Sequence, residues 1–143
     1  MNIQRVHPKA VLPKRGSLGA AGYDLCAAID QPVVIEPHET VKISTGLKME
    51  IPEGYFGAIV ARSGLASKEG LTPIQGMAVI DEDYRGEIFI PLHNHTDTAR
   101  LVMPMQRIAQ MILMRYRLEP MMEVDEDLTE TERGEGGFGS TGA

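Results

Sequence analysis

Residues 46–60 read GLKMEIPEGYFGAIV, and this stretch decides the class of fold that we expect. Apolar and polar side chains alternate over residues 46–51, and residues 55–60 form a second short, mainly apolar run. Pro52 and Gly54 separate the two runs. Short β-type runs bounded by turn-forming residues predict a pair of β-strands rather than a helix.

Similar runs lie on both sides of this stretch. We expect further strands at residues 32–35, 41–44, 79–80, 87–92 and 107–114. One short helix is expected over residues 63–68, with Ser63 as its N-cap and Gly70 as its stop. Many short strands with almost no helix predict an all-β fold, either a β-sandwich or a jelly-roll-like barrel.

The length and charge of the chain limit the functions that it can have. A chain of 143 residues suits one domain with a substantial core and is too short for two. The formal net charge of −6 argues against a nucleic-acid partner, because such proteins use basic patches to bind the backbone. It permits a small polyanion such as a nucleotide, which a few arginines and backbone amides can bind.

No apolar run approaches the ~20 residues that span a membrane, and the N-terminus has no signal-peptide pattern. We therefore expect an intracellular, soluble protein of the cytoplasm or nucleus, with no membrane partner. Cys26 is the only cysteine, which excludes an intramolecular disulfide and fits a reducing compartment. Its apolar context favours a small core residue over a nucleophile.

Two histidines, His93 and His95, would face the same side of one strand. Two histidines alone make a poor metal site, and nothing near them in the sequence adds a tight set of His, Cys or carboxylate ligands. We therefore expect both to be ordinary surface residues.

The composition changes at the C-terminal end of the chain. Residues 119–132 are acidic and residues 133–142 read RGEGGFGSTG, a glycine-rich segment that cannot build a core alone. We divide the chain into a β body, residues 1–119, and an acidic linker with a glycine-rich tail, residues 120–143.

The tail has the residue types that bind a nucleotide. Its glycines let backbone N–H groups approach a phosphate, Arg133 adds a guanidinium, and Ser140 and Thr141 add hydroxyl donors. Phe138 can stack on a base. Ordering ten residues costs roughly 1–2 kcal/mol each, whereas stacking returns about 1–3 kcal/mol. We therefore expect a lid that orders over a bound nucleotide; the alternative is a flexible tail of no consequence.

Residues 79–87 read VIDEDYRGE, an acidic turn between two apolar runs, which predicts a hairpin. Asp and Gly are turn formers, so a plain solvent-exposed turn also explains the pattern. Asp81 directly follows the apolar pair Val79–Ile80, and a carboxylate anchored in this way can orient and deprotonate a water. The spacing alone leaves both interpretations open.

Three shorter segments contain further candidates. In ARSGLA, residues 61–66, a guanidinium, a hydroxyl and free amides converge as in an anion site, although Ser is also a common N-cap. Asp24 lies in AGYDL and Gln110 in QRIAQ. Asp24 could serve a hydrated cation and Gln110 a phosphate oxygen, or either could be a buried hydrogen-bonding residue.

Together, these segments resemble the five motifs of the trimeric dUTPase family, and they occur in the order of that family. The matches are AGYDL, ARSGLA, VIDEDYRGE, RIAQ and RGEGGFGSTG. The resemblance implies a distorted jelly roll, a β-clip-type barrel with one short helix, assembled as a homotrimer with shared active sites. It also implies hydrolysis of dUTP to dUMP and pyrophosphate, which limits uracil incorporation into DNA and supplies dUMP for dTMP synthesis.

The resemblance assigns a role to individual residues. Asp81 is the catalytic residue, which positions a water for in-line attack on the α-phosphorus. The cofactor is Mg2+, carried mainly by the triphosphate, with Asp24 as a ligand through water. The implied phosphate contacts are Arg62, Ser63, Gly64, Gln110, Arg133, Gly139, Ser140 and Thr141. The implied uracil and deoxyribose contacts are Gln75, Ala78, Val79, Ile80, Tyr84, Phe89 and Phe138.

The sequence departs from the family at a few positions. Ala78 stands where the family usually has Gly close to the base, and Met77 before it is uncommon. Met105 and Gln106 replace the usual Gly and acidic residue before RIAQ, and we expect this change to alter a turn.

Three other functions fit part of the pattern. A dCTP deaminase of the same fold would need a catalytic Glu beside the base, and Glu82 is the candidate. A regulatory trimer that binds dUTP and a protein partner without catalysis would also keep the tail. A purely structural jelly-roll assembly protein would explain neither the tail nor the Arg-Ser-Gly segment.

Overall fold

The computed structural model describes residues 1–137 and shows a mostly β chain with one short helix, as predicted. The elements of the N-terminal half are β1 (Ile3–Arg5), β2 (Lys14–Arg15), β3 (Tyr23–Cys26), β4 (Val33–Ile35), β5 (Thr40–Ser44), β6 (Leu47–Met49) and β7 (Tyr55–Val60). The remaining elements are α1 (Ser63–Glu69), β8 (Leu71–Pro73), β9 (Met77–Ile80), β10 (Phe89–Asn94), β11 (Arg100–Val102) and β12 (Arg107–Arg115).

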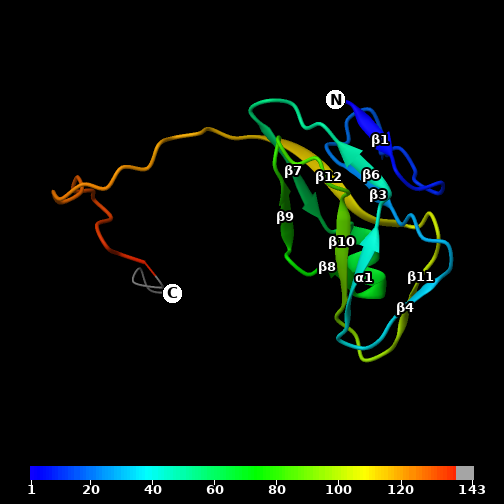
Figure 1. The fold of residues 1–143 in the computed structure, drawn as a ribbon. Helices are drawn as coiled ribbons and strands as arrows, with labels where there is room; N and C mark the ends of the chain where they lie inside the picture. The colour runs from blue at the N-terminus through cyan, green and yellow to red at the C-terminus, as the bar shows by residue number, and fades with distance from the viewer. Residues whose placement is uncertain (138–143) are drawn as a thin grey trace.

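The described strands form four sheets. The largest has the order β2-β3-β12-β7-β9, and a second has the order β5-β10-β8. Two strand pairs, β1-β6 and β11-β4, complete the body. These sheets pack around a common core but do not join into one closed barrel (Figure 1).

Strand β12 is the centre of the largest sheet, with β3 on one side and β7 on the other. Its Ile108, Ala109 and Met111 are fully buried. Strand β10 alternates strictly, because Ile90, Leu92 and Asn94 are buried while the residues between them are only half-buried. A strand with one face on the core and one face outward has this period of two. The outward face of β10 is therefore available to a functional site.

One expected strand and the end of the expected helix agree with the structure. Strand β7 has the expected bounds, and α1 ends at Gly70 as predicted, with φ of 64° at that glycine. The expected N-cap is wrong: Arg62 is the N-cap residue, and Ser63 is the first helical residue. No side chain caps this helix, so the Ser63 hydroxyl is not used for capping.

The hairpin expected over residues 79–87 is also wrong in its strand pairing. Strand β9 pairs with β7, whereas β10 pairs with β5 and β8. The two strands that flank the acidic turn therefore belong to different sheets. Because they diverge instead of pairing, a hollow can form between them.

Cys26 is buried at the end of β3, which confirms it as a core residue. Burial first, and the Asp24 carboxylate second, raise the pKa of its thiol, while Arg107 and Arg62 act in the opposite direction. A thiol with a raised pKa is a poor nucleophile at neutral pH. Among residues 1–137, no helix has the length and apolar character to span a bilayer.

Candidate active site

A hollow of about 270 Å3 lies where β9 and β10 diverge. It brings together Asp81 and all the base- and sugar-contact residues that the sequence predicted in the body. Its lining consists of Lys42, Gln75, Ala78, Val79, Ile80, Asp81, Tyr84, Glu87, Ile88, Phe89 and Pro91. We call it the Asp81 pocket.

Tyr84 is folded back over the acidic turn at one end of the Asp81 pocket. Its hydroxyl donates a hydrogen bond to the Glu87 carbonyl at 3.0 Å, and its N–H donates to the Asp81 carbonyl at 3.2 Å. A Cβ atom at Gly86 would lie 2.3 Å from the Tyr84 hydroxyl oxygen, so only glycine fits there. The turn thus fixes the position of the ring.

Glu87 anchors this turn to the neighbouring sheet, a role that the sequence did not predict. Its Oε1 accepts hydrogen bonds from the Ser44 hydroxyl at 2.5 Å and from the Gly46 N–H at 3.2 Å. Thr45, which is fully buried, donates through its hydroxyl to the Ile88 carbonyl at 2.6 Å. At this end of the pocket, hydrogen bonds therefore join the acidic turn to the end of β5.

Glu82 follows Asp81 directly but faces a different hollow. Its Oε2 accepts a hydrogen bond from the Gly54 N–H at 2.6 Å. With Phe56 and Tyr116 it lines an adjacent hollow, which Asp81 and Val79 also border. Partial removal from water raises the pKa of the Tyr116 hydroxyl, and a hydrogen bond to Glu82 raises it further. Glu82 does not line the Asp81 pocket.

A second constellation, which we call the Asp24 cluster, lies where β3, β12 and the start of α1 meet. Arg62 donates from Nε to Oδ1 of Asp24 at 2.7 Å, and Arg107 donates from Nη1 to Oδ2 at 3.1 Å. Only 19% of the Asp24 side chain is exposed, so this carboxylate is shielded and paired on both oxygens. Two guanidinium groups against one carboxylate leave the cluster with net positive charge, which favours an anion.

The Asp24 cluster borders a hollow of about 230 Å3, lined by Gly16, Ala20, Gly22, Asp24, Arg62, Ser63, Gly64, Arg107 and Gln110. All the phosphate contacts that the sequence predicted in the body are therefore close together. Gln110 donates from Nε2 to the Ala61 carbonyl at 3.0 Å. A Cβ atom at Gly22 would lie 2.2 Å from Gln110 Oε1, so the glycine of AGYDL makes room for this side chain.

Arg107 was missed as a site residue, although it begins the RIAQ segment. Its pairing with Asp24 depends on the register of β3 against β12, which has an irregularity between Arg107 and Ala109. The shift lets Arg107 reach the carboxylate while Gln110 stands opposite Asp24 in the ladder. The available signal was its place in the same RIAQ segment as Gln110, which was already a candidate phosphate contact.

The Asp81 pocket and the Asp24 hollow share no lining residue. Within one copy of the chain, the predicted base contacts and the predicted phosphate contacts therefore form two separate groups.

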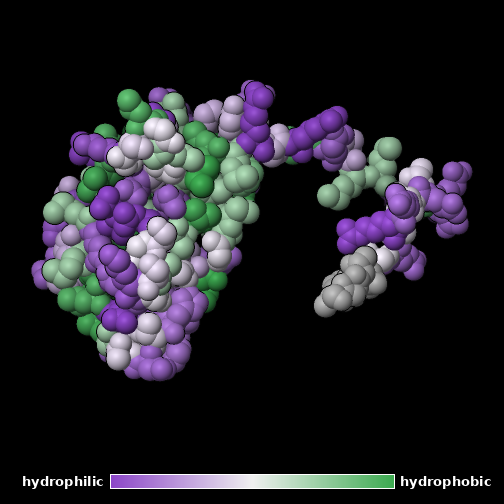
Figure 2. Space-filling view, turned by 180° about the vertical axis from the view of Figure 1, so that it is seen from behind, coloured by the Kyte–Doolittle hydropathy of each residue, from purple (hydrophilic) through white to green (hydrophobic). Residues whose placement is uncertain are grey.

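The segment after β12, which we call the arm (residues 116–137), runs away from the body, as Figure 1 and Figure 2 both show. Arg133 donates from Nε to the Gly136 carbonyl at 2.8 Å, and Gly134 donates to the Thr131 carbonyl at 3.0 Å. These contacts are local, so the structure does not bring Arg133 to either hollow. The predicted lid residues Phe138, Gly139, Ser140 and Thr141 lie outside the described residues.

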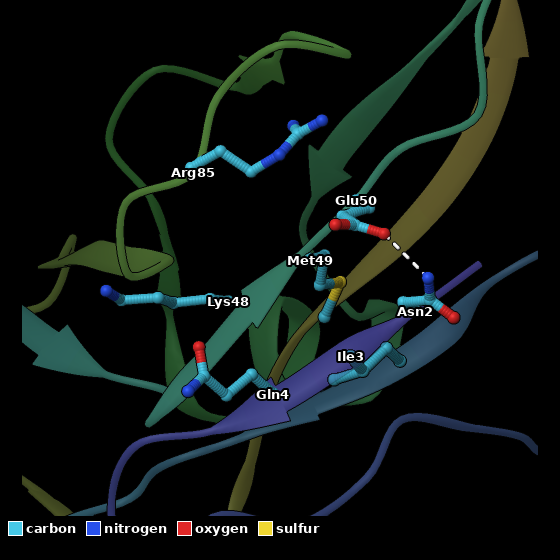
Figure 3. A pocket seen from close by; sticks show the side chains of 7 residues that line it. All are labelled: Asn2, Ile3, Gln4, Lys48, Met49, Glu50 and Arg85. Atoms are coloured by element: carbon cyan, nitrogen blue, oxygen red, sulfur yellow. Dashed lines mark hydrogen bonds between the residues drawn. The ribbon is translucent and has the colours of Figure 1, made fainter.

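A further hollow, of about 340 Å3, lies between β1, β6 and the acidic turn (Figure 3). Its lining consists of Asn2, Ile3, Gln4, Lys48, Met49, Glu50 and Arg85. At one end of this hollow, Asn2 donates from Nδ2 to Oε2 of Glu50 at 2.7 Å. It contains none of the site residues that the sequence predicted.

The departures from the family pattern have distinct structural positions. Ala78 is half-buried in β9 opposite Ile59 and lines the Asp81 pocket, whereas Met77 is largely exposed. Met105 has φ of 62°, the left-handed region that favours glycine. The Gln106 N–H still closes the turn onto the Met103 carbonyl at 3.1 Å. The turn thus forms with Met105 in a conformation that costs about 1–2 kcal/mol for a residue with a side chain.

Comparison with known proteins gives a consistent result. The sequence profile of the dUTPase family matches residues 8–142. The chain is 43% identical to the deoxyuridine 5'-triphosphate nucleotidohydrolase of Syntrophotalea carbinolica, over 99% of this chain and 96% of the relative. It is 46% identical to the protein of that name from Chlamydia pneumoniae, over 92% of this chain and 91% of the relative.

A solved dUTPase structure has the same fold as this chain. The dUTPase of Staphylococcus bacteriophage 80alpha with bound dUPNHPP superposes with a TM-score of 0.90 at 29% identity, covering 99% of this chain and 98% of that chain.

Proposed function

Because this chain belongs to the dUTPase family and is a dUTP diphosphatase, we propose that it cleaves dUTP to dUMP and pyrophosphate by in-line attack of water on the α-phosphorus. The observation that supports this most is the Asp81 pocket, where an exposed carboxylate lies beside a fixed tyrosine ring and an edge strand. Asp81 has no salt bridge among residues 1–137, so its oxygens are available to a water and to a sugar hydroxyl.

Strand β9 provides the base recognition in this proposal. It is the last strand of its sheet, so one side of its backbone lacks a strand partner within the described body. Backbone N–H and C=O groups at Ala78 and Val79 can then pair with the edge of uracil, as an added strand would. Cytosine would place a donor against a donor, which costs binding energy.

Tyr84 provides the selection against ribose. Its ring is held by the hydroxyl's hydrogen bond to the Glu87 carbonyl and by contact with Gly86, which opposes a shift of the ring to admit an added hydroxyl. A fixed aromatic surface beneath the sugar then favours deoxyribose. Phe89 and Gln75 complete the wall of the same pocket.

The Asp24 cluster provides the phosphate end. Arg62 supplies a guanidinium, Ser63 a hydroxyl without a capping role, and Gly64 an exposed backbone, while Gln110 supplies an amide. Arg107 joins them as a second guanidinium that is 58% exposed. These groups hold the triphosphate and stabilise charge that develops on its oxygens.

The residues fit Mg2+ that is held through the substrate. Among residues 1–137 no group of three or more His, Cys, Asp or Glu side chains could form a metal cage. Mg2+ commonly keeps several waters and binds one or two carboxylates together with substrate phosphates. Each Asp24 oxygen accepts one arginine N–H and retains a lone pair for a metal-bound water. Bound Mg2+ would neutralise negative charge on the phosphate oxygens.

We extend the proposal to a homotrimer with shared active sites. The base pocket and the phosphate hollow share no residue within one copy, and the arm leads away from its own body. A site completed by other copies removes both difficulties. The arm of a further copy, with Arg133, Phe138, Gly139, Ser140 and Thr141, would then close over the nucleotide.

A deaminase acting on dCTP is the weaker alternative. It would use Glu82 beside the base, but this carboxylate is bonded to the Gly54 N–H and borders another hollow. The glutamate that does line the Asp81 pocket, Glu87, is bonded to Ser44 and Gly46.

The decisive experiment is pyrophosphate release from dUTP, UTP, dCTP and dTTP, each with Mg2+ and with EDTA. We expect release from dUTP alone, lost with EDTA, and a trimer by light scattering. Ammonia release from dCTP would favour the deaminase. No release from any nucleotide by folded, trimeric protein would refute catalysis and favour a regulatory binding function.

A further inference from the structure

The outward face of the β5-β10-β8 sheet has a histidine pair outside the candidate active site. His93 is in β10, and His95 is the first residue after the strand, with its ring beside that of His93. Their ring centres are 4.4 Å apart, with an angle of 73° between the rings. The sequence predicted two ordinary surface residues, but the structure holds them as a closely packed pair.

Each ring is oriented by a threonine from a flanking strand. Thr40 Oγ1 and His93 Nδ1 are hydrogen-bonded at 2.9 Å, and Thr72 Oγ1 and His95 Nε2 at 2.7 Å. Thr40 lies in β5 and Thr72 in β8, so the strand on each side of β10 supplies one hydroxyl. In metal sites, the second ring nitrogen of a ligating histidine almost always donates its N–H to a carboxylate, a backbone carbonyl or a water, which fixes the tautomer. A threonine hydroxyl can accept a hydrogen bond in the same way.

We propose that this pair binds one divalent transition-metal ion through Nε2 of His93 and Nδ1 of His95. Within the part of the chain that the structure describes, the hydrogen bonds of the two rings use only the opposite nitrogens. A hydroxyl can accept from each of these N–H groups, which leaves a lone pair on the two proposed ligand atoms.

The separation of the rings fits two ligands on adjacent positions of one ion. With a metal–nitrogen bond of about 2.0–2.1 Å, two imidazoles at right angles have ring centres roughly 4.5 Å apart. A tetrahedral pair has centres roughly 5 Å apart by the same geometry. The observed 4.4 Å is nearest to the right-angled arrangement of square-planar or octahedral ions.

The chemistry of the donors selects Cu2+, Ni2+ and Zn2+ over Mg2+. Imidazole nitrogen suits these ions, whereas Mg2+ prefers oxygen. No third His, Cys, Asp or Glu joins the pair among residues 1–137, so the remaining positions are left to water. The pair lies outside the Asp81 pocket, whose lining includes neither histidine. The nearest lining residue on β10 is Pro91, about 7 Å from His93 along the strand at ~3.3 Å per residue.

Calorimetric titration of the untagged full-length protein with Ni2+, in excess Mg2+ and without nucleotide, tests this inference. We expect saturable Ni2+ binding that excess Mg2+ does not displace. His93→Gln and His95→Gln should each weaken binding at least tenfold. Thr72→Val should weaken it about 10-fold or more, because the orientation of the His95 ring is lost. With Cu2+, the electron paramagnetic resonance spectrum should show two nitrogen ligands.

His38→Gln is the matched control, since His38 is an exposed histidine paired with Asp97 at 2.9 Å and has no part in the site. Its Ni2+ affinity should equal that of the wild type. Unchanged dUTP hydrolysis in all four variants shows that each is folded. The proposal is overturned if neither Ni2+ nor Cu2+ binds the wild type, or if the His93 and His95 variants bind as tightly as His38→Gln.

Discussion

Asp24 and Asp81 are both carboxylates of the candidate site, but the structure treats them differently. Asp24 is shielded, in the middle of a sheet, with an arginine on each oxygen. Asp81 is exposed, at the end of an edge strand, and forms no salt bridge among the described residues. One is a structural charge that holds two cations in place, and the other is free to act on a ligand.

This difference separates two roles that the sequence alone could not separate. A carboxylate saturated by arginines holds them at the position where phosphates bind, and its loss disturbs both geometry and stability. A carboxylate without partners contributes little to the fold, so its loss should affect the reaction alone. Variants at the two positions should therefore fail in different ways.

The largest effect is expected for Asp81→Asn, which removes the base and keeps the shape. The rate of dUTP hydrolysis should fall by about 10²–10⁴-fold, the range attributed to a positioned general base. Binding of a non-hydrolysable dUTP analogue should be nearly unchanged, because the pocket wall is intact. Steady-state pyrophosphate release and calorimetry measure the two quantities.

The thermal midpoint of Asp81→Asn should equal that of the wild type, as a control for folding. Hydrolysis at the wild-type rate would rule out Asp81 as the residue that positions water, and the contrast with Asp24 would then have no catalytic meaning.

Truncation after Glu132 is expected to have the next largest effect. It removes Arg133 and the glycine-rich tail but no hydrogen bond between arm and body, because the contacts of Arg133 and Gly134 are local. The value of kcat/KM should fall on the order of 10²-fold, as expected when closure no longer orients the substrate. Circular dichroism and light scattering should show the same fold and oligomer, and an unfolded product would contradict the division of the chain into body and tail.

Asp24→Asn should affect stability and turnover together. It leaves Arg62 and Arg107 without their shared counter-charge, so we expect the free energy of unfolding to fall by about 1–2 kcal/mol, a range that allows for the exposure of Arg107. The KM for dUTP should rise about tenfold, because the guanidinium groups lose their fixed positions. Urea unfolding and steady-state kinetics measure these changes.

Asp30→Asn is the matched control for Asp24→Asn. The Asp30 side chain is 75% exposed, and its oxygen is 3.7 Å from Lys9 Nζ. An exposed pair of this kind contributes little, so the free energy of unfolding should change by less than about 0.5 kcal/mol. Equal losses at the two positions would show that the Asp24 pairs are no more important than a surface pair.

The sequence predicted local features of the two regions and missed how they combine. The short, mainly apolar run of residues 55–60 located β7, and Gly70 located the end of the helix, because both signals depend on neighbours in the chain. The two-residue and three-residue strands β2 and β8 have too few residues to show a period. The pairing of Arg107 with Asp24 joins residues 83 positions apart and depends on strand register.

The same limit applies to the Asp81 pocket and to the histidine pair. Residues 79–87 have the composition of a hairpin, but partners for β9 and β10 come from distant strands, so the hollow between them could not be inferred. His93 and His95 were expected on one face of a strand, and their rings do lie together, although His95 follows the last residue of β10. Thr40 and Thr72, which orient the rings, come from flanking strands that only the sheet order identifies.

The smallest effect is expected for Met105→Gly, which tests backbone strain in the turn beside the Asp24 cluster. Met105 donates its N–H to the Ala27 carbonyl at 2.8 Å, joining the end of β3 to the turn before Arg107. The φ of 62° costs about 1–2 kcal/mol for a residue with a side chain but nothing for glycine. Against this gain, the greater conformational freedom of glycine in the unfolded chain lowers the free energy of unfolding by about 0.5–1 kcal/mol. The net gain in the free energy of unfolding should be about 0.5–1 kcal/mol.

Met103→Gly separates relief of backbone strain from a general tolerance of glycine in this turn. Met103 is the same residue type, comparably exposed and two positions away, but it is not among the described residues with positive φ. Glycine there should lower the free energy of unfolding, so urea denaturation at one protein concentration should shift the two variants in opposite directions. If both variants lose stability, the left-handed conformation of Met105 is not strained, and the turn beside the Asp24 cluster tolerates Met as well as Gly.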